Sequence, residues 1–137
     1  MNVLLVRPHA TLPTSRWLQA MIRLEPYAQE LVAGGVLPPH DVRICDLAVE
    51  ARPLEAFRRQ LEAYRPDLVG FGGFSSQYVT NCVLARICKA ALPGVVTCLG
   101  GVHVSSAPAA CHAPECFDYL VRGDGVSAIK ILLEALA

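Results

Sequence analysis

Leu68-Val69-Gly70-Phe71-Gly72-Gly73-Phe74-Ser75-Ser76-Gln77 decides the fold class, because an apolar run enters a loop of small and polar residues and then a helix. The run Leu68 to Phe71 is nearly continuous in apolar residues, which is typical of a parallel strand covered on both faces. Apolar residues then recur at helical spacing at Val79, Val83 and Ile87. A covered strand followed by a helix predicts one repeat of an alternating α/β domain.

The same alternation extends in both directions along the chain. Four further apolar runs are bounded by Gly, Pro or Asp and predict strands: Val3 to Val6, Val42 to Leu47, Val95 to Leu99 and Tyr119 to Val121. Two further helical stripes are Leu54, Phe57, Leu61 and Tyr64, and Val126, Ile129, Leu133 and Leu136. Proline and glycine mark helix ends: Pro26 before Tyr27 to Ala33 with Gly34-Gly35 behind, then Pro66 and Pro93. We therefore predict a flavodoxin-like, Rossmann-type α/β fold, with a doubly wound five-stranded parallel sheet in a three-layer α/β/α arrangement.

Length and composition narrow the class of protein. The 137 residues suit one domain, spanning residues 1–137. Twelve basic and twelve acidic residues balance, so nothing indicates binding to nucleic acid phosphates. The first apolar run is far shorter than a membrane-spanning helix, and no signal peptide precedes it. The six cysteines lie mostly within apolar runs, as reduced thiols do, and we expect a cytoplasmic protein without a membrane span.

Ligands of doubly wound sheets lie outside the carboxyl ends of the strands. The loops expected there are 7–25, 72–77, 100–106 and 123–126. Ser75 and Ser76 offer hydroxyl groups to a ligand, or one of them caps the following helix. The pair Gly100-Gly101 allows either an ordinary turn or close approach of a flat ligand, and Asp124 is placed to cap the last helix.

Three of these loops together resemble a known family. The runs that carry the resemblance are Pro66-Asp67-Leu68-Val69-Gly70-Phe71, Ser75-Ser76-Gln77, Leu99-Gly100-Gly101-Val102-His103 and Val121-Arg122-Gly123-Asp124-Gly125. Their order and spacing are similar to those of the cobalamin-binding domain of cobalamin-dependent radical SAM enzymes. With similar segments upstream, the resemblance covers nearly the whole chain.

The resemblance implies a cobalamin site in which the nucleotide tail of the cofactor enters a slot beside the sheet, while the corrin lies over the carboxyl edge. Gly72, Phe74 and Ser76 then face the tail, and Gly100 and Gly101 pack against it. The family usually carries Glu where this chain has Asp124. The cofactor-binding residues that we predict are Pro8, His9, Gly72, Phe74, Ser75, Ser76, Gln77, Gly100, Gly101, Val102, His103, Gly123 and Asp124.

The resemblance also indicates what the chain lacks. The Asp-x-His-x-x-Gly motif that supplies a histidine to cobalt in other cobalamin domains is absent after the first strand. We therefore expect the tail to be displaced from cobalt without a motif histidine replacing it, and His9 is the residue to consider as a substitute axial ligand. No Cys-x-x-x-Cys-x-x-Cys run is present to hold an iron–sulfur cluster. The chain is then a non-catalytic module that serves a radical SAM partner of the methyltransferase type, in cis or in trans, either excised or free-standing.

Four other interpretations remain. An FMN-binding electron carrier would use the same edge of the sheet, with Thr11, Thr14 and Ser15 as hydroxyl donors, although prolines interrupt that loop. A signalling receiver needs an aspartate at the end of the third strand, where Gly72-Gly73 stands. Zinc at His103, Cys111, His112 and Cys116 has no standard spacing. A domain without cofactor would instead use Trp17, Leu18, Met21 and Ile22 to cover a partner.

Overall fold

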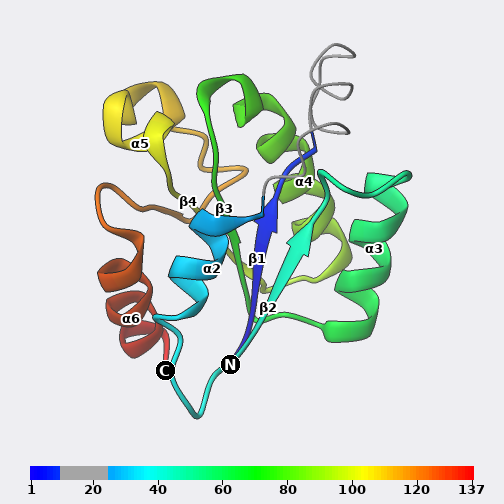
Figure 1. The fold of residues 1–137 in the computed structure, drawn as a ribbon, viewed down its shortest axis with the longest axis horizontal. Coiled ribbons are helices and arrows are strands. Elements are labelled where there is room, and N and C mark those ends of the chain that lie inside the picture. The colour runs from blue at the N-terminus through cyan, green and yellow to red at the C-terminus, as the bar shows by residue number, and fades with distance from the viewer. Residues whose placement is uncertain (10–24) are drawn as a thin grey trace.

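The structure is a computed structural model that describes residues 1–9 and 25–137. Strands and helices alternate along the chain (Figure 1). The strands are β1 (Asn2–Arg7), β2 (Asp41–Asp46), β3 (Leu68–Phe71), β4 (Val96–Leu99) and β5 (Tyr119–Leu120). The helices are α2 (Tyr27–Ala33), α3 (Pro53–Tyr64), α4 (Tyr78–Ala91), α5 (Val102–Ser106) and α6 (Gly125–Leu136), with 3-10 turns η1 (Ser75–Gln77) and η2 (Pro108–Cys111).

All five strands are parallel and stand in the order β2-β1-β3-β4-β5. On β1, Leu5 pairs with Ile44 of β2 on one side and with Gly70 of β3 on the other. The direction in which the chain winds reverses between β1 and β3, and this is the switch point where such sheets bind ligands. The predicted flavodoxin-like fold is confirmed.

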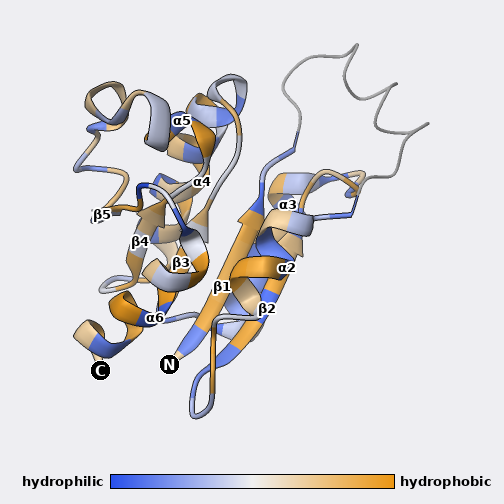
Figure 2. Ribbon diagram, turned by 60° about the vertical axis from the view of Figure 1, so that its left-hand side comes forward, coloured by the Kyte–Doolittle hydropathy of each residue, from blue (hydrophilic) through white to orange (hydrophobic). Residues whose placement is uncertain are grey.

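The sheet is covered on both faces. Residues on alternate positions of each strand point to opposite sides, so β1 sends Leu4 and Val6 into one core and Val3 and Leu5 into the other. The first core contains side chains of α3 and α4, and the second contains side chains of α6 with the end of α2. These two cores give the three predicted layers, and β1 is apolar over most of its length (Figure 2).

Helix ends follow the signals read from the sequence. α3 begins with Pro53 and ends where Arg65 takes a left-handed conformation, followed by Pro66. α6 begins at Asp124, whose carboxylate accepts hydrogen bonds from the backbone N–H groups of Val126 (3.0 Å) and Ser127 (3.1 Å). The prediction that Asp124 caps the last helix is therefore confirmed.

The predicted apolar stripe of α4 is wrong for Val79 and Val83, whereas Ile87 is partly buried against the first core. Val79 is 70% exposed and Val83 is 43% exposed, whereas the face toward the sheet carries Thr80, Asn81, Leu84, Ala85 and Cys88. The inner face lies one position further along the helix and mixes polar with small side chains, so the larger valines gave the stronger apolar signal. In α3, Phe57, Leu61 and Tyr64 are buried as predicted, but Leu54 is exposed.

The cysteines behave as small apolar residues. Cys45, Cys88, Cys98, Cys111 and Cys116 are buried, Cys82 is half-buried, and all six are free thiols. Burial raises the pKa of the Cys88 and Cys98 thiols to about 12, so these groups stay protonated. Within residues 1–9 and 25–137, no helix combines the length and the apolar character needed to cross a membrane.

Candidate functional site

The loops that follow β3, β4 and β5 gather at one edge of the sheet, at the top of Figure 1, and the chain ends lie at the opposite edge. Parallel strands bring their carboxyl ends to a common edge, so residues far apart in the sequence become neighbours there. Of the predicted cofactor-binding residues, those from Gly72 onward all lie in or beside these loops. The candidate site is this edge.

Four small residues form a floor on one face of the sheet at this edge. We call Gly70, Gly72, Cys98 and Gly100 the small-residue floor. Residues two apart on a strand share a face, and Cys98 belongs to the core beneath α6, so these four positions face the layer of α2 and α6. The helix α2 on this face has no fully buried residue and packs on the second core through Val32 and Ala33. Sequence reasoning had found only Gly72 and Gly100 of these four.

Gly72 and Gly100 have more room than packing within the protein requires. Among the residues that the structure describes, a Cβ atom added at Gly72 would meet Gln29 Nε2 at 3.8 Å and the Gly100 carbonyl oxygen at 3.9 Å. At Gly100 it would lie 3.5 Å from Cβ of Val121, which is ordinary van der Waals contact. The packing of residues 1–9 and 25–137 therefore does not require glycine at these two positions. Gln29 and Val121, which sequence reasoning missed, flank the floor.

Gly101 has a different role. Its φ of +98° and ψ of −172° are accessible to glycine almost alone. An added Cβ would also lie 3.0 Å from the backbone N and O atoms of Gly73. The two glycine loops thus pack backbone against backbone, and this contact already explains why glycine stands at position 101.

Ser75 and His103 connect the loops after β3 and β4. The Ser75 hydroxyl and His103 Nδ1 form a hydrogen bond of 2.8 Å, and the Tyr78 ring lies 5.2 Å from the imidazole ring. Burial, together with a hydrogen bond to Cys82, raises the pKa of the Tyr78 phenol to about 12, so it stays neutral. Neither Ser75 nor Ser76 caps a helix, because η1 and α4 begin without a side-chain cap hydrogen bond. The capping interpretation is therefore wrong.

Ser105 connects the loops after β4 and β5. Its hydroxyl donates to the Gly101 carbonyl oxygen (3.1 Å) and accepts from the Gly123 backbone N–H (3.1 Å). No sequence signal singled it out, since a serine one turn into a short helix is common. With Ser75 and His103, it makes the three loops one hydrogen-bonded unit.

The remaining predicted residues differ in what they offer a ligand. Phe74 is 67% exposed and Val102 is 60% exposed, and Ser76 is exposed beside them. Gln77 turns inward instead, since its Oε1 accepts the Phe74 backbone N–H at 3.0 Å. The hydroxyl of Ser127 and the helix N–H groups lower the pKa of Asp124, whose carboxylate is thus occupied by the start of α6.

At the end of β1 the chain turns through a buried Pro8 to a half-buried His9. Arg7, just before them, pairs with Asp46 through Nε at 3.4 Å. Thr11, Thr14, Ser15, Trp17, Leu18, Met21 and Ile22, which the FMN and partner interpretations use, lie outside the described residues.

Two other features bear on alternative sites. Among residues 1–9 and 25–137, no group of three His, Cys, Asp or Glu side chains is placed to hold a metal ion.

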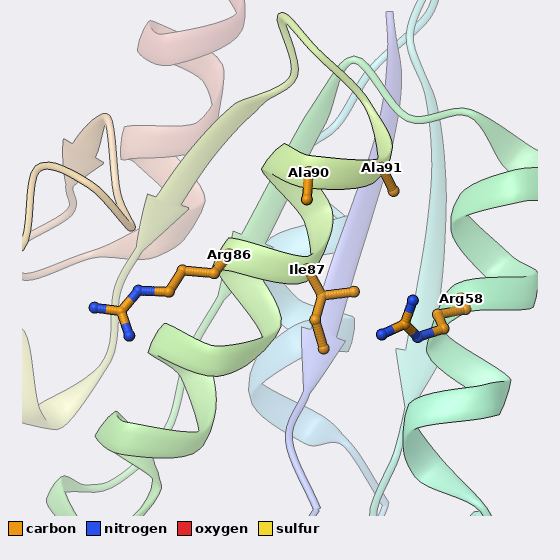
Figure 3. Close-up of a pocket in the computed structure, with 5 residues that line it drawn as sticks. All are labelled: Arg58, Arg86, Ile87, Ala90 and Ala91. Carbon is orange, nitrogen blue, oxygen red and sulfur yellow. The ribbon is translucent and has the colours of Figure 1, made fainter.

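A cavity of about 370 Å³ lies between α3 and α4, lined by Arg58, Arg86, Ile87, Ala90 and Ala91. Arg58 extends toward Ile87, whereas Arg86 points away from it and pairs with Glu115 at 3.1 Å (Figure 3). This cavity is remote from the loops after the strands.

The fold and the connected loops define a doubly wound α/β domain built to hold a ligand at its carboxyl edge. Residues 24–133 match the B12 binding domain family, and the chain belongs to this family. Cobalamin is accordingly its cofactor. The FMN interpretation is not favoured.

Two relatives and one solved structure show the extent of the likeness. Over its whole length the chain is 36% identical to a hopanoid C-3 methylase of Methylococcus capsulatus and 29% identical to an uncharacterized methyltransferase of Pyrococcus horikoshii. It spans only 26% and 30% of the length of these proteins. A CheY-like protein, TadZ, of Pseudomonas aeruginosa superposes with a TM-score of 0.59 at 15% identity, covering 99% of this chain and 92% of that one. That likeness shows the fold alone; in this chain Gly72 and Gly73 follow β3, where a signalling receiver would need an aspartate.

The residues present fit this cofactor. A flat, largely apolar nucleotide base needs a floor without side chains, and Gly72 and Gly100 leave such space while the chain tolerates more bulk. Neutral hydrogen-bonding groups of Ser75 and Ser76 lie in the same loop after β3 as Gly72. The exposed Phe74 and Val102 present apolar surface at the edge, as a corrin face requires.

Proposed function

We propose that this domain holds cobalamin with its nucleotide tail on the small-residue floor and dissociated from cobalt, and that it serves a radical SAM methyltransferase. Bound cobalamin supplies a metal centre that carries a methyl group. The domain is not catalytic alone and contributes binding, orientation and environment. The observation that carries the proposal is the unused space at Gly72 and Gly100, beside the switch point of the sheet.

The site residues have different roles, which depend on the loop in which each lies. Gly72 and Gly100 admit the tail, while Gly101, Gly123 and Ser105 keep the loops after β4 and β5 at a fixed distance. Ser75 and His103 fix the loop after β3 against α5, and the ring of Tyr78 supports the imidazole. Phe74 and Val102 are exposed apolar side chains at this edge; Phe74 would face the tail and Val102 the corrin, and both would exclude water from the bound cofactor.

The Asp-x-His-x-x-Gly motif is absent after β1, so this chain would supply no motif histidine to the cobalt of a bound cobalamin. The chain there reads Arg7-Pro8-His9, and His9 is the residue to test as a substitute ligand. The relatives that match the whole chain are named as a methylase and a methyltransferase. This supports methyl transfer as the reaction of the assembly.

Titration with hydroxocobalamin and with methylcobalamin, followed by visible absorption, tests the binding mode. We expect saturable binding and the spectrum of cobalamin whose tail has left cobalt. The variant His9→Ala should leave this spectrum unchanged if no histidine replaces the tail, and a shift would assign His9 as the ligand. Failure to bind, or a spectrum with the tail still on cobalt, would refute the proposal.

The partner is tested separately. The cobalamin-loaded domain is immobilised, and polypeptides captured from the source organism are assayed for iron and for dependence on S-adenosylmethionine. We expect a captured protein with an iron–sulfur cluster. Capture of a methyltransferase without iron would argue against the radical SAM assignment and leave cobalamin binding intact.

A further inference from the structure

Asn81 is a buried residue of α4 whose side-chain amide contacts the loop after β3. It lies in the first turn of α4, only 1% exposed, on the face toward the sheet. Its Nδ2 donates to the carbonyl oxygen of Gly72 at 3.4 Å, which is the long end of a hydrogen bond. Its Oδ1 is buried and has no hydrogen-bond partner among the residues that the structure describes.

The buried, half-satisfied amide of Asn81 does not stabilise the protein without cofactor. A buried acceptor without a donor keeps its cost of desolvation, and an apolar side chain of similar volume would avoid that cost. A buried amide that is half satisfied therefore needs another explanation. The contact of Asn81 with Gly72, a member of the small-residue floor, points to the cofactor.

We propose that Asn81 is a positioning residue for cobalamin, an inference that rests on the proposed function. Its amide holds the Gly72 carbonyl and with it the backbone that faces the tail. When the cofactor is seated, Oδ1 accepts a backbone N–H of the loop 72–77, and the hydrogen bond to Gly72 shortens. The amide is thus fully satisfied only in the loaded protein.

The loop itself explains why such an anchor is needed. Gly72 and Gly73 have no side chains with which to fix this segment, and Gly73 has a φ of +142°. The next side-chain contact to another loop is made by Ser75 with His103. Between the end of β3 and Ser75, two side chains hydrogen-bond this backbone within the described part of the chain: Gln77 of the adjacent turn η1 at Phe74, and Asn81 of α4 at Gly72.

Thr80 supplies a matched control within the same turn. Its hydroxyl is also buried without a hydrogen-bond partner in the described residues, and the residue is 5% exposed. Its hydroxyl makes no hydrogen bond to the loop after β3 within residues 1–9 and 25–137. The variants Asn81→Leu and Thr80→Val each replace a buried polar group by an apolar one of similar size, and only the first removes the contact with Gly72.

The experiment compares unfolding by urea and cobalamin binding for the two variants and the wild type. We expect both variants to be at least as stable as the wild type without cofactor. Asn81→Leu should bind hydroxocobalamin about five- to tenfold more weakly, the effect of roughly one hydrogen bond, while Thr80→Val binds normally. In hydrogen exchange, cobalamin should protect amides of 73–76 in the wild type and fail to do so in Asn81→Leu.

Each outcome decides the inference. Equal affinity of Asn81→Leu and the wild type, or equal loss in both variants, would overturn it. If Asn81→Leu does not fold, exchange in the wild type decides, because unchanged protection of 73–76 on loading refutes the new hydrogen bond. A wild type that does not bind cobalamin would refute the proposed function itself, which is a separate result.

Discussion

Gly72, Gly100 and Gly101 lie close together at the carboxyl edge of the sheet, but substitution by alanine should affect Gly101 differently from the other two. Alanine at Gly72 or Gly100 should weaken cobalamin binding and leave the fold intact. Alanine at Gly101 should destabilise the fold. The contrast follows from what a Cβ atom would meet at each position.

The magnitudes come from the local geometry. At Gly72 and Gly100 the nearest atoms would be 3.5 Å or more from the added carbon, and neither residue has a positive φ. Alanine there reduces the entropy of the unfolded chain and adds about 0.4–1 kcal/mol to the free energy of unfolding. At Gly101 the backbone conformation costs alanine about 1–3 kcal/mol, and contacts of 3.0 Å with Gly73 increase that cost.

Urea unfolding of the cofactor-free protein measures the first difference, and titration with hydroxocobalamin measures the second. The added methyl group occupies space needed by the tail, and overpacking of this kind costs about 1–3 kcal/mol, or roughly five- to 150-fold in affinity. Gly34→Ala is the control, because Gly34 has a φ of −61° and lies at the far end of α2, where an added Cβ would lie 3.3 Å from the Leu31 carbonyl oxygen.

Two results would refute the reasoning. If Gly72→Ala and Gly100→Ala both bind cobalamin like the wild type, the tail does not lie on the small-residue floor. If Gly101→Ala is as stable as Gly34→Ala, the packing of the two glycine loops does not require glycine at position 101.

Three further predictions concern the loops, the edge strand and the thiols. Ser105→Ala should speed cobalamin dissociation, measured by stopped-flow absorption, because it disconnects the loops after β4 and β5; an unchanged rate would remove Ser105 from the site. Burial raises the pKa of Asp118, but hydrogen bonds from Lys89 and Thr97 outweigh this, so its pKa lies below the ordinary value of 3.8. A carboxylate with a lowered folded pKa stabilises the protein above that ordinary value and loses the effect as pH falls through the folded pKa. Urea unfolding should therefore show Asp118→Asn less stable near pH 7, with the gap closing below about 3.8, and a gap independent of pH would contradict this. Reaction of the native protein with a thiol reagent should be confined to Cys82 at early times, since the other five cysteines are buried; rapid modification of several thiols would show that the core opens.

The strands were predictable because apolar runs between glycines and prolines leave few alternatives. β1, β3 and β4 are covered on both faces, so their sequences contain almost nothing polar to confuse the pattern. α4 was harder, because it is apolar on two sides. Its outward valines are larger than the alanine and cysteine that face the sheet, so size misled the assignment of the buried face.

The site was predictable where a loop contains unusual residues and unpredictable where contact is long-range. The glycine pairs stand out in the sequence, but nothing indicates that Gly101 packs on Gly73, 28 positions away, while Gly100 stays uncrowded. The hydrogen bond of Ser75 with His103 spans the same separation. The burial of Asn81 could not be predicted for another reason, because an asparagine in a helix is ordinarily expected to face solvent.

The cross-links among the loops have an energetic consequence for binding. Ordering several loops around a ligand costs conformational entropy, which reduces affinity unless the loops are ordered beforehand. Here His103, Ser105 and Gly101 already connect the loops after β3, β4 and β5 in the protein without cofactor. In the segment between β3 and Ser75, Gly73 packs on Gly101 and Gln77 holds Phe74, whereas Gly72 is held by one long hydrogen bond from Asn81. Any adjustment on binding should therefore be concentrated at Gly72, and the rest of the edge should behave as a preformed surface.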